Sequence, residues 1–324
     1  MIKVLLIGVG GMGGCHLGEY RKLKDSCTLA AVADVETEKT KEKVKEDGIK
    51  VYYDYKEAIE KEQPDVVDIC TPSYMHADMA VYALSHGCNV LCEKPMALNS
   101  EDCKRMKQCA EENNKLLMTA HVVRFMSPYV YLREQIQSGE MGAIKEISLQ
   151  RVCENPQWSW ENWMLDRKKS GCALFDLVVH DIDYVQSIFK SPKHINAVYN
   201  KRKSDKDSDI VHIQLAYDGF TACISGGHYG ANIPFQVNYF AVFENGYIRF
   251  DGNDIYKNGV KAEQQKSNQT EDTGINIKNA DGYFEEIRAF INCVKEKNAD
   301  VPVLPQSSID TILLTEEIYK QAKM

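Results

Sequence analysis

The N-terminal third of the chain alternates short apolar runs with more polar stretches of helical length. Apolar runs rich in Val, Ile, Leu and Ala, bounded by turn residues, are typical of buried strands. They predict strands at residues 2–7, 29–33, 51–52, 66–70, 88–92 and 115–119. The stretches between them predict helices at 12–23, 36–47, 55–61, 77–85 and 100–113. This alternation favours a parallel sheet covered by helices on both faces, and we assign residues 1–121 to this domain.

The pattern changes after residue 121, where several strands follow one another directly. Strands are predicted at 144–152, 210–217, 220–225, 235–243 and 247–250, and helices at 127–138, 172–189, 283–297 and 307–323. Period-two alternation along 235–243 and the turn pairs Asp218-Gly219 and Asn245-Gly246 predict an antiparallel sheet. Residues 122–324 form the second predicted domain, with the alternative that the last helix packs back on the first. The polar stretch 251–280 gives no prediction.

The composition limits the partners. The 324 residues carry a formal net charge of −8, from 39 basic and 47 acidic side chains, without a basic stripe that contains aromatics. This argues against a nucleic-acid partner. No apolar run reaches the length that spans a membrane, and the turn at Gly8 begins too early for a signal peptide to precede it. We therefore expect a cytoplasmic protein.

The eleven cysteines are scattered and include no C-x-x-C pair. A disulfide framework or a structural zinc site is therefore not expected. We predict small buried thiols in a reducing compartment, and no metal.

A glycine-spaced turn, Gly8-x-Gly10-x-x-Gly13, joins the first strand to the first helix. Gly8 permits a tight turn, Gly10 lets the backbone approach a pyrophosphate, and Gly13 lets the helix pack closely on the strand. The N–H groups of the helix N-terminus would face the phosphates. Asp34 ends the second strand, where a ribose-binding carboxylate is expected, and it favours NAD because it would repel a 2′-phosphate.

Open parallel sheets bind ligands beyond the carboxyl ends of their strands. The residues predicted to bind the cofactor share that position, at strand ends or at the start of the helix that follows. They are Gly8, Gly10, Gly11, Met12, Gly13, Asp34, Thr71, Pro72, Ser73, His76, Glu93 and Lys94. His76 has a second interpretation, as the cap of its own helix. No arginine follows Asp34 directly, but Lys39 and Lys41 leave room for NADP.

Lys94 stands between Glu93 and Pro95, where a strand ends at this rim. A lysine there is usually a solvated surface charge. The proline, however, restricts the backbone of the preceding residue and admits a cis peptide bond, so that the side chain can be held in one direction. A fixed ammonium beside a nicotinamide would stabilise an alkoxide or polarise a carbonyl. Both interpretations stay open on position alone.

Asp176 and His180 are four residues apart on the apolar helix 172–189, which places both side chains on one face, and Asp183 extends the same stripe. Polar groups on a buried helix must meet partners or a cavity. One interpretation is a hydrogen-bonded core histidine. The other is a general acid/base pair, in which the carboxylate orients or charges the imidazole.

Two further regions offer substrate contacts. Trp158, Trp160 and Trp163 lie in an irregular stretch that is either core, the safer interpretation, or a pocket whose aromatic faces meet sugar rings. His121 and Arg124 lie at the junction of the predicted domains, where ligands tend to bind. The predicted substrate-binding residues are Lys94, Arg124, Trp163, Asp176 and His180.

The chain carries, in order, the turn 8–13, Thr71-Pro72-Ser73-x-x-His76, Glu93-Lys94-Pro95, Arg124-Phe125 with Pro128, and the segment 170–183. In this order they resemble the Gfo/Idh/MocA family (glucose–fructose oxidoreductase and inositol dehydrogenase), over nearly the whole length. The resemblance implies an α/β protein: an N-terminal Rossmann domain with a doubly wound parallel sheet, and a C-terminal α/β domain with a large, mostly antiparallel open sheet. It also implies a nicotinamide cofactor and hydride transfer on a sugar, polyol or related substrate.

By the same resemblance, the catalytic residues are Lys94, Asp176 and His180, and the run from His180 to Asp183 is similar to that of inositol dehydrogenases. Two departures stand out. The glycine-rich lead into the second-domain helix is here Gly171-Cys172-Ala173, and a glycine common two residues after the aspartate is Val178. The valine adds bulk near Asp176 and puts the substrate in question.

We therefore expect an NAD-dependent dehydrogenase or reductase that acts on CH–OH groups of a sugar, inositol or related polyol. The sheet of the second domain would form a homodimer or homotetramer. Either His180 or Lys94 would accept the proton, because their titrations would be coupled. The alternatives are a glycosidase that uses NAD for transient oxidation and a non-catalytic nucleotide-sensing protein.

Overall fold

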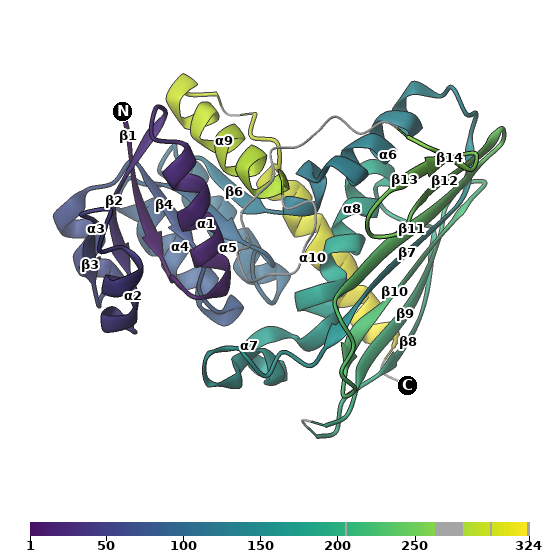
Figure 1. Ribbon diagram of the computed structural model, residues 1–324, viewed down its shortest axis with the longest axis horizontal. Coiled ribbons are helices and arrows are strands. Elements are labelled where there is room, and N and C mark those ends of the chain that lie inside the picture. Colours follow the sequence, from purple (N-terminus) through teal and green to yellow (C-terminus); the bar gives the residue numbers. More distant parts are fainter. Residues whose placement is uncertain (205, 263–280, 299, 323–324) are drawn as a thin grey trace. The chain divides into compact units, whose positions relative to one another are not determined.

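The computed structural model describes residues 1–204, 206–262, 281–298 and 300–322 (Figure 1). They form two compact units. Of the described residues, unit 1 contains 1–121 and 283–309, and unit 2 contains the remainder of 122–262, residues 281–282 and 310–322. Residues 283–309 thus belong to unit 1, although the second predicted domain ran to residue 324. Residue 323 of the predicted last helix, and 263–280 of the stretch without a prediction, lie outside the described residues.

Unit 1 is built on a parallel sheet of six strands in the order β3-β2-β1-β4-β5-β6. The strands are β1 (Ile2–Ile7), β2 (Cys27–Ala33), β3 (Lys50–Tyr52), β4 (Val66–Ile69), β5 (Asn89–Glu93) and β6 (Leu117–Ala120). The helices are α1 (Gly11–Lys22), α2 (Thr37–Lys43), α3 (Tyr55–Glu62), α4 (His76–Ser85), α5 (Ser100–Glu112) and most of α9 (Asp281–Glu296). The predicted doubly wound sheet is confirmed. Its strand order reverses at β1, so the carboxyl ends of β1 and β4 flank the point where such sheets bind ligands.

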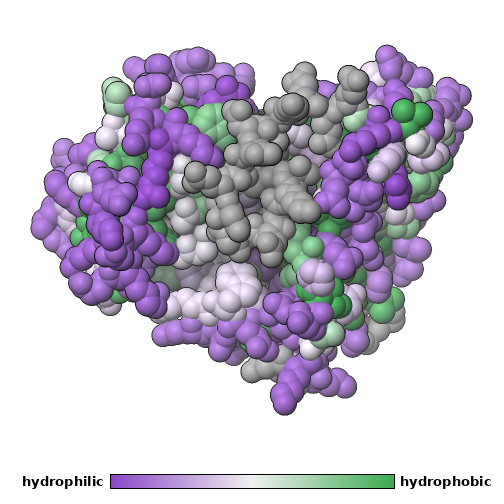
Figure 2. Space-filling model, viewed as in Figure 1, coloured by the Kyte–Doolittle hydropathy of each residue, from purple (hydrophilic) through white to green (hydrophobic). Residues whose placement is uncertain are grey.

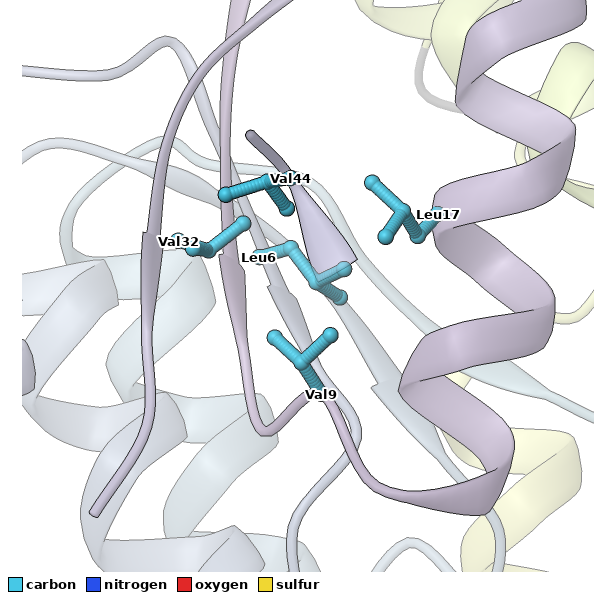
Figure 3. Close-up of a cluster of buried hydrophobic side chains, with 5 residues drawn as sticks. All are labelled: Leu6, Val9, Leu17, Val32 and Val44. Atoms are coloured by element: carbon cyan, nitrogen blue, oxygen red, sulfur yellow. The ribbon is translucent and has the colours of Figure 1, made fainter. Parts of the chain in front are cut away.

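A cluster of buried aliphatic side chains fixes the glycine turn on the sheet (Figure 3). Leu6 of β1, Val32 of β2, Leu17 of α1 and Val44 after α2 form one cluster with Val9, and none of the five is more than 2% exposed. Val9 lies inside the turn itself. Burial of such a side chain stabilises by roughly 1.5–3 kcal/mol, so Val9 holds the turn on the sheet while Gly10 and Gly11 are exposed.

Unit 2 is built on an eight-stranded sheet in the order β14-β13-β12-β11-β7-β10-β9-β8. The strands are β7 (Ile144–Glu154), β8 (His194–Asn200), β9 (Asp209–Ala216), β10 (Thr221–Tyr229), β11 (Gln236–Phe243), β12 (Gly246–Phe250), β13 (Ile255–Lys257) and β14 (Val260–Lys261). Its helices are α6 (Ser127–Ser138), α7 (Arg167–Ser170), α8 (Val179–Phe189) and the part of α10 (Pro305–Gln321) from residue 310 onward. Among the described strands of unit 2, β10 and β7 alone pair in parallel, which confirms the mostly antiparallel sheet.

The sequence pattern did not predict three strands of unit 2, namely β8, β13 and β14. In β8 only Ala197 and Tyr199 are buried, so the strand lacks a strong apolar signal. The strands β13 and β14 have three and two residues and lie in the polar stretch without a prediction. Strands this short leave no period to detect.

The two faces of the unit 2 sheet differ. On β9, Val211, Ile213 and Leu215 are buried, whereas His212 and Gln214 between them are exposed. Figure 1 shows α8 along one face. The other face carries a groove of about 490 Å³ lined by strands β7 to β11.

Most of the surface of unit 1 is hydrophilic in the view of Figure 2. Among the described residues, no helix has both the length and the apolar character that crossing a bilayer requires. All eleven cysteines are free thiols, and most are buried.

Candidate active site

The glycine turn has the backbone geometry that a dinucleotide requires. Gly8 has φ +83°, and a Cβ on it would lie 2.6 Å from the carbonyl oxygen of Cys70. A Cβ on Gly13 would lie 1.8 Å from the carbonyl oxygen of Gly8. Within the described chain, no side chain caps α1 at Gly10, and Gly10 and Gly11 are exposed. The first N–H groups of α1 are therefore open to a phosphate, and the residues present fit the pyrophosphate of NAD.

Asp34 is fixed beside this turn. One carboxylate oxygen accepts the N–H of Val9 at 2.6 Å, and the other accepts the N–H of Glu36 at 2.8 Å. The two lysines that left room for NADP are engaged elsewhere, since Lys39 pairs with Glu36 and Lys41 pairs with the next glutamate on α2. The site thus presents a carboxylate where the ribose is expected, which favours NAD.

The predicted rim residues lie at the carboxyl ends of β4 and β5. Thr71, Pro72 and Ser73 directly follow β4, and Lys94 directly follows β5. The imidazole of His76 ties the two segments together, with Nδ1 2.8 Å from the carbonyl oxygen of Pro95 and Nε2 2.9 Å from that of Thr71. His76 therefore does not cap its helix. Its contact with the cofactor stays a prediction.

Lys94 is half-buried, and its peptide bond to Pro95 is cis. Its backbone N–H donates to Oε2 of Glu93 at 2.9 Å. Glu93 is 4% exposed, so this hydrogen bond fixes the backbone that carries the lysine.

The helix that carries Asp176 and His180 is not the single α-helix predicted. Residues Leu174–Val178 are π-helical, and α8 continues from Val179. Gly171 and Cys172, which precede the helix, have φ of +71° and +56°. The helix start is held by Asp209 of β9, whose Oδ2 accepts the N–H of Ala173 at 2.8 Å. Single π turns are frequent at functional sites.

His228 of β10 is a site residue that the sequence did not reveal. Its Nε2 lies 3.3 Å from Oδ2 of Asp176, and His228 is 1% exposed. The predicted strand 220–225 ended too early, whereas β10 continues to Tyr229. Continued period-two alternation from Ile224 through Gly226 would have placed His228 on the inner face. His228 also pairs across the sheet with Asp209, so two neighbouring strands hold one helix start.

Asp183 was predicted to continue the polar face of Asp176 and His180, but its carboxylate has partners of its own. Its carboxylate accepts Nε and Nη2 of Arg124 at 2.7 and 2.6 Å and the hydroxyl of Thr311 at 2.9 Å. The neighbouring carboxylate, Asp181, similarly pairs with Arg151. Arg124 is 9% exposed, so these contacts give it a structural role. Its predicted contact with substrate stays a prediction.

The side chain of Val178 packs against the sheet of unit 2, beside Gly226 of β10. It is fully buried, and a Cβ on Gly226 would lie 2.8 Å from Val178 Cγ2. Val178 stands where a glycine is common in the family that the sequence resembles, and Gly226 on β10 leaves the space that the valine side chain occupies.

The tryptophan-rich stretch is not core. Trp158 is 71% exposed and Trp160 40% exposed, which overturns the core interpretation for both, while Trp163 is half-buried. Glu161 and Asn162 between them adopt left-handed backbone conformations. The role of Trp163 in substrate binding stays a prediction.

Two family models match the chain: "Oxidoreductase family, NAD-binding Rossmann fold" over residues 2–121, and "GFO/IDH/MocA C-terminal domain" over residues 129–249. The chain belongs to the GFO/IDH/MocA oxidoreductase family. Unit 1 thus contains the NAD-binding domain of this family.

Individual relatives differ in what they do. The chain is 30% identical over 187 residues to 2,7-anhydro-N-acetylneuraminate hydratase of Mediterraneibacter gnavus, covering 56% of this chain and 47% of that protein. It is 27% identical over 232 residues to scyllo-inositol 2-dehydrogenase (NADP(+)) of Bacillus subtilis, covering 70% and 63%. The chain thus spans less than two thirds of the length of both. The crystal structure of myo-inositol 2-dehydrogenase from Lactobacillus plantarum has the same fold, with a TM-score of 0.82, 19% identity, and coverage of 99% of this chain and 97% of that one.

Proposed function

We propose that the protein is an NAD-dependent oxidoreductase that transfers a hydride between the nicotinamide and a CH–OH or carbonyl carbon of a sugar, inositol or related polyol. The observation that carries the proposal is the π-helical turn that contains Asp176 and leads directly into the α8 residue His180, in a chain whose unit 1 belongs to an NAD-binding family. Bound NAD supplies the hydride acceptor.

The side chains would divide the remaining work. In the oxidation direction, His180 takes the hydroxyl proton, and the ammonium of Lys94 stabilises the developing oxyanion. Asp176 orients His180 and is itself held by His228. Lys94 belongs to unit 1 and the other three to unit 2, so their joint action is part of the proposal.

A panel of inositols, sugars and glycosides, assayed with NAD and with NADP, tests this function. We expect NADH formation with at least one polyol or sugar. We also expect a loss of kcat of about 100-fold or more in Lys94→Ala and in His180→Ala, the usual size for a general acid/base. Lys104→Ala and His194→Ala change exposed residues of the same types and serve as controls. Full activity in both site variants would rule out the mechanism.

The same panel separates the alternatives. Neither a glycosidase nor a nucleotide-sensing protein is favoured by the relatives' names. Hydration, the reaction type in the name of the Mediterraneibacter relative, involves no net change in redox state, so substrate consumption is followed by chromatography beside NADH absorbance. Loss of substrate without NADH would replace the dehydrogenase proposal with such a reaction.

We also propose that the outer face of the unit 2 sheet forms a homodimer or homotetramer. Val198 and Phe240 on this face are 64% and 39% exposed beside the groove. Phe240→Glu should then shift the sedimentation coefficient towards the monomer, and an unchanged coefficient would contradict the proposal.

A further inference from the structure

A charged cluster is buried directly beneath the glycine turn of unit 1. His16 of α1 places Nδ1 2.8 Å from Oδ2 of Asp68 on β4, and Nε2 3.3 Å from Oε1 of Glu93 at the end of β5. His16 and Asp68 are fully buried, and Glu93 is 4% exposed. Tyr20 adds a hydroxyl bond to Asp68 Oδ2 at 2.9 Å. One imidazole thus joins the helix that faces the pyrophosphate to two strands of the sheet.

The cluster is an imidazolium between two carboxylates. Burial disfavours the charged ring, but the contacts with Asp68 and with Cys70 together outweigh burial and raise the pKa of His16 well above its ordinary value. Burial likewise opposes the charge of Glu93, yet His16 holds the pKa of this carboxyl below its ordinary value. A lone buried charge would be costly, and pairing compensates that cost.

The other titratable groups that face His16 are neutral. They are Cys15 and Tyr20 on α1, Cys70 after β4, and Tyr283 on α9. Burial raises the pKa of each of these thiols and phenols. The Nδ1 of His16 and the Asp68 oxygen already lie at hydrogen-bond distance, so no metal ion is needed to hold His16, Asp68 and Cys70 together.

Glu93 connects His16 to Lys94, because each of its carboxylate oxygens faces one of these two residues. Its Oε1 faces His16, and its Oε2 accepts the backbone N–H of Lys94 at 2.9 Å. Oε2 is hydrogen-bonded and Oε1 faces the imidazole in an ion-pair contact, so the two contacts together favour one orientation of the carboxylate. We propose that His16 is a positioning residue, which acts through Glu93 to fix the backbone of Lys94 and thereby the direction of its ammonium. The proposal rests on the proposed function for the part that Lys94 plays in the reaction.

Two variants of His16 separate its two contacts. In His16→Gln the side-chain amide reaches the position of Nε2 and still donates to Glu93. In His16→Asn the amide nitrogen replaces Nδ1, so it keeps Asp68 and loses Glu93. Both variants remove the charge of the imidazolium, so they should lower the stability of the fold by similar amounts. Thermal melting of each variant checks that it is folded.

The first readout does not need activity. Competitive acetylation with acetic anhydride across pH, followed by mass spectrometry, gives the reactivity of the Lys94 amine relative to exposed Lys104. We expect this ratio to change at least about threefold in His16→Asn and to stay as in the unmodified protein in His16→Gln. Equal ratios in all three proteins would overturn the proposal. A ¹⁵N NMR spectrum showing no proton on Nε2 of His16, the nitrogen that faces Glu93, would also overturn it.

The second readout is kinetic. We expect kcat to fall about 100-fold in His16→Asn, the scale of a misplaced reacting group, with KM and the Kd of NAD within about threefold, and kcat to be largely restored in His16→Gln. Equal kcat losses in both variants would overturn the proposal. If the unmodified protein turns over no substrate of the panel, the proposed function fails, while the labelling and NMR results still decide whether His16 fixes Lys94.

Discussion

The two units build their parts of the candidate site from different materials. The glycine turn of unit 1 offers backbone N–H groups, and its shape depends on the absence of side chains at Gly8 and Gly13. The helix of unit 2 offers side chains, and carboxylates along it meet buried partners on other elements, as Asp176 meets His228 and Asp183 meets Arg124. The turn of unit 1 has no room for a Cβ at Gly8 or Gly13, whereas the unit 2 helix depends on the buried partners of its carboxylates. A substitution that adds a side chain should therefore disrupt the turn, and one that removes a partner should disrupt the surroundings of the helix.

The largest effect on cofactor binding is expected from adding one carbon to the turn. In Gly13→Ala the new Cβ would lie 1.8 Å from the carbonyl oxygen of Gly8, so the turn must shift away from the phosphates. The Kd of NAD, measured by calorimetry, should rise about 100-fold or more, since several backbone hydrogen bonds are lost together. Gly14→Ala is the matched control, because a Cβ there meets nothing within 4 Å. Unchanged affinity in Gly13→Ala would mean that the turn does not bind the pyrophosphate.

Removing a partner in unit 2 should affect stability instead. Asp183→Ala leaves the buried guanidinium of Arg124 without its bidentate carboxylate, which should lower the free energy of unfolding by about 3–5 kcal/mol. Lys193→Ala removes an exposed ion pair with Asp218 and should cost less than about 1 kcal/mol. Urea unfolding measures both. Similar values would show that the buried pair is not structural.

The buried charge of unit 1 predicts a pH dependence of stability. The folded pKa of His16 is raised, so its stabilisation is fully present below the unfolded pKa near 6.5 and is lost as the pH rises through the folded value. As the pH rises from the unfolded value towards the folded pKa, the unfolding free energy should fall by up to about 1.4 kcal/mol per pH unit. His16→Gln should flatten this slope, and an identical slope in the variant would assign it to other groups.

A smaller effect should follow from uncoupling the Asp176 pair. His228→Phe keeps a planar aromatic ring and removes the nitrogen that faces Asp176. We expect kcat to fall about tenfold, which corresponds to one hydrogen bond of about 1.4 kcal/mol, with KM nearly unchanged. His194→Phe, on an exposed position of β8, should leave kcat as it is. A lower melting temperature with an unchanged kcat would limit His228 to a structural role.

The last expected change concerns the choice of cofactor. Asp34→Ser removes the charge at the ribose position but keeps an acceptor for the N–H of Val9. The ratio of kcat/KM for NAD to that for NADP should fall about tenfold, because the 2′-phosphate is no longer repelled. Asp25→Ser, on the surface of the same unit, should not change this ratio. A constant ratio would place the ribose elsewhere.

The same contrast explains what could be predicted from the sequence. The turn, Asp34 and the strand ends are set by local residue order, so the parallel sheet and its rim were predictable from spacing. The partners of the unit 2 helix were not, because the contact of Asp176 with His228 joins residues far apart in the chain. The π turn was also hidden, since its residues are apolar like those of any buried α-helix. Burial of the charged cluster around His16 depends on three separate elements and leaves no local signal.

The contact between Val178 and Gly226 has a consequence for redesign. A Cβ on Gly226 would meet Val178 and also the backbone carbonyl oxygen of Arg151, at 2.5 Å, so Val178 fills a space that no side chain at position 226 can enter. Exchanging Val178 for glycine to enlarge the substrate site would open a void against the sheet instead. No change at position 226 can fill that void, so libraries that vary substrate scope should randomise positions other than 178 and 226 first.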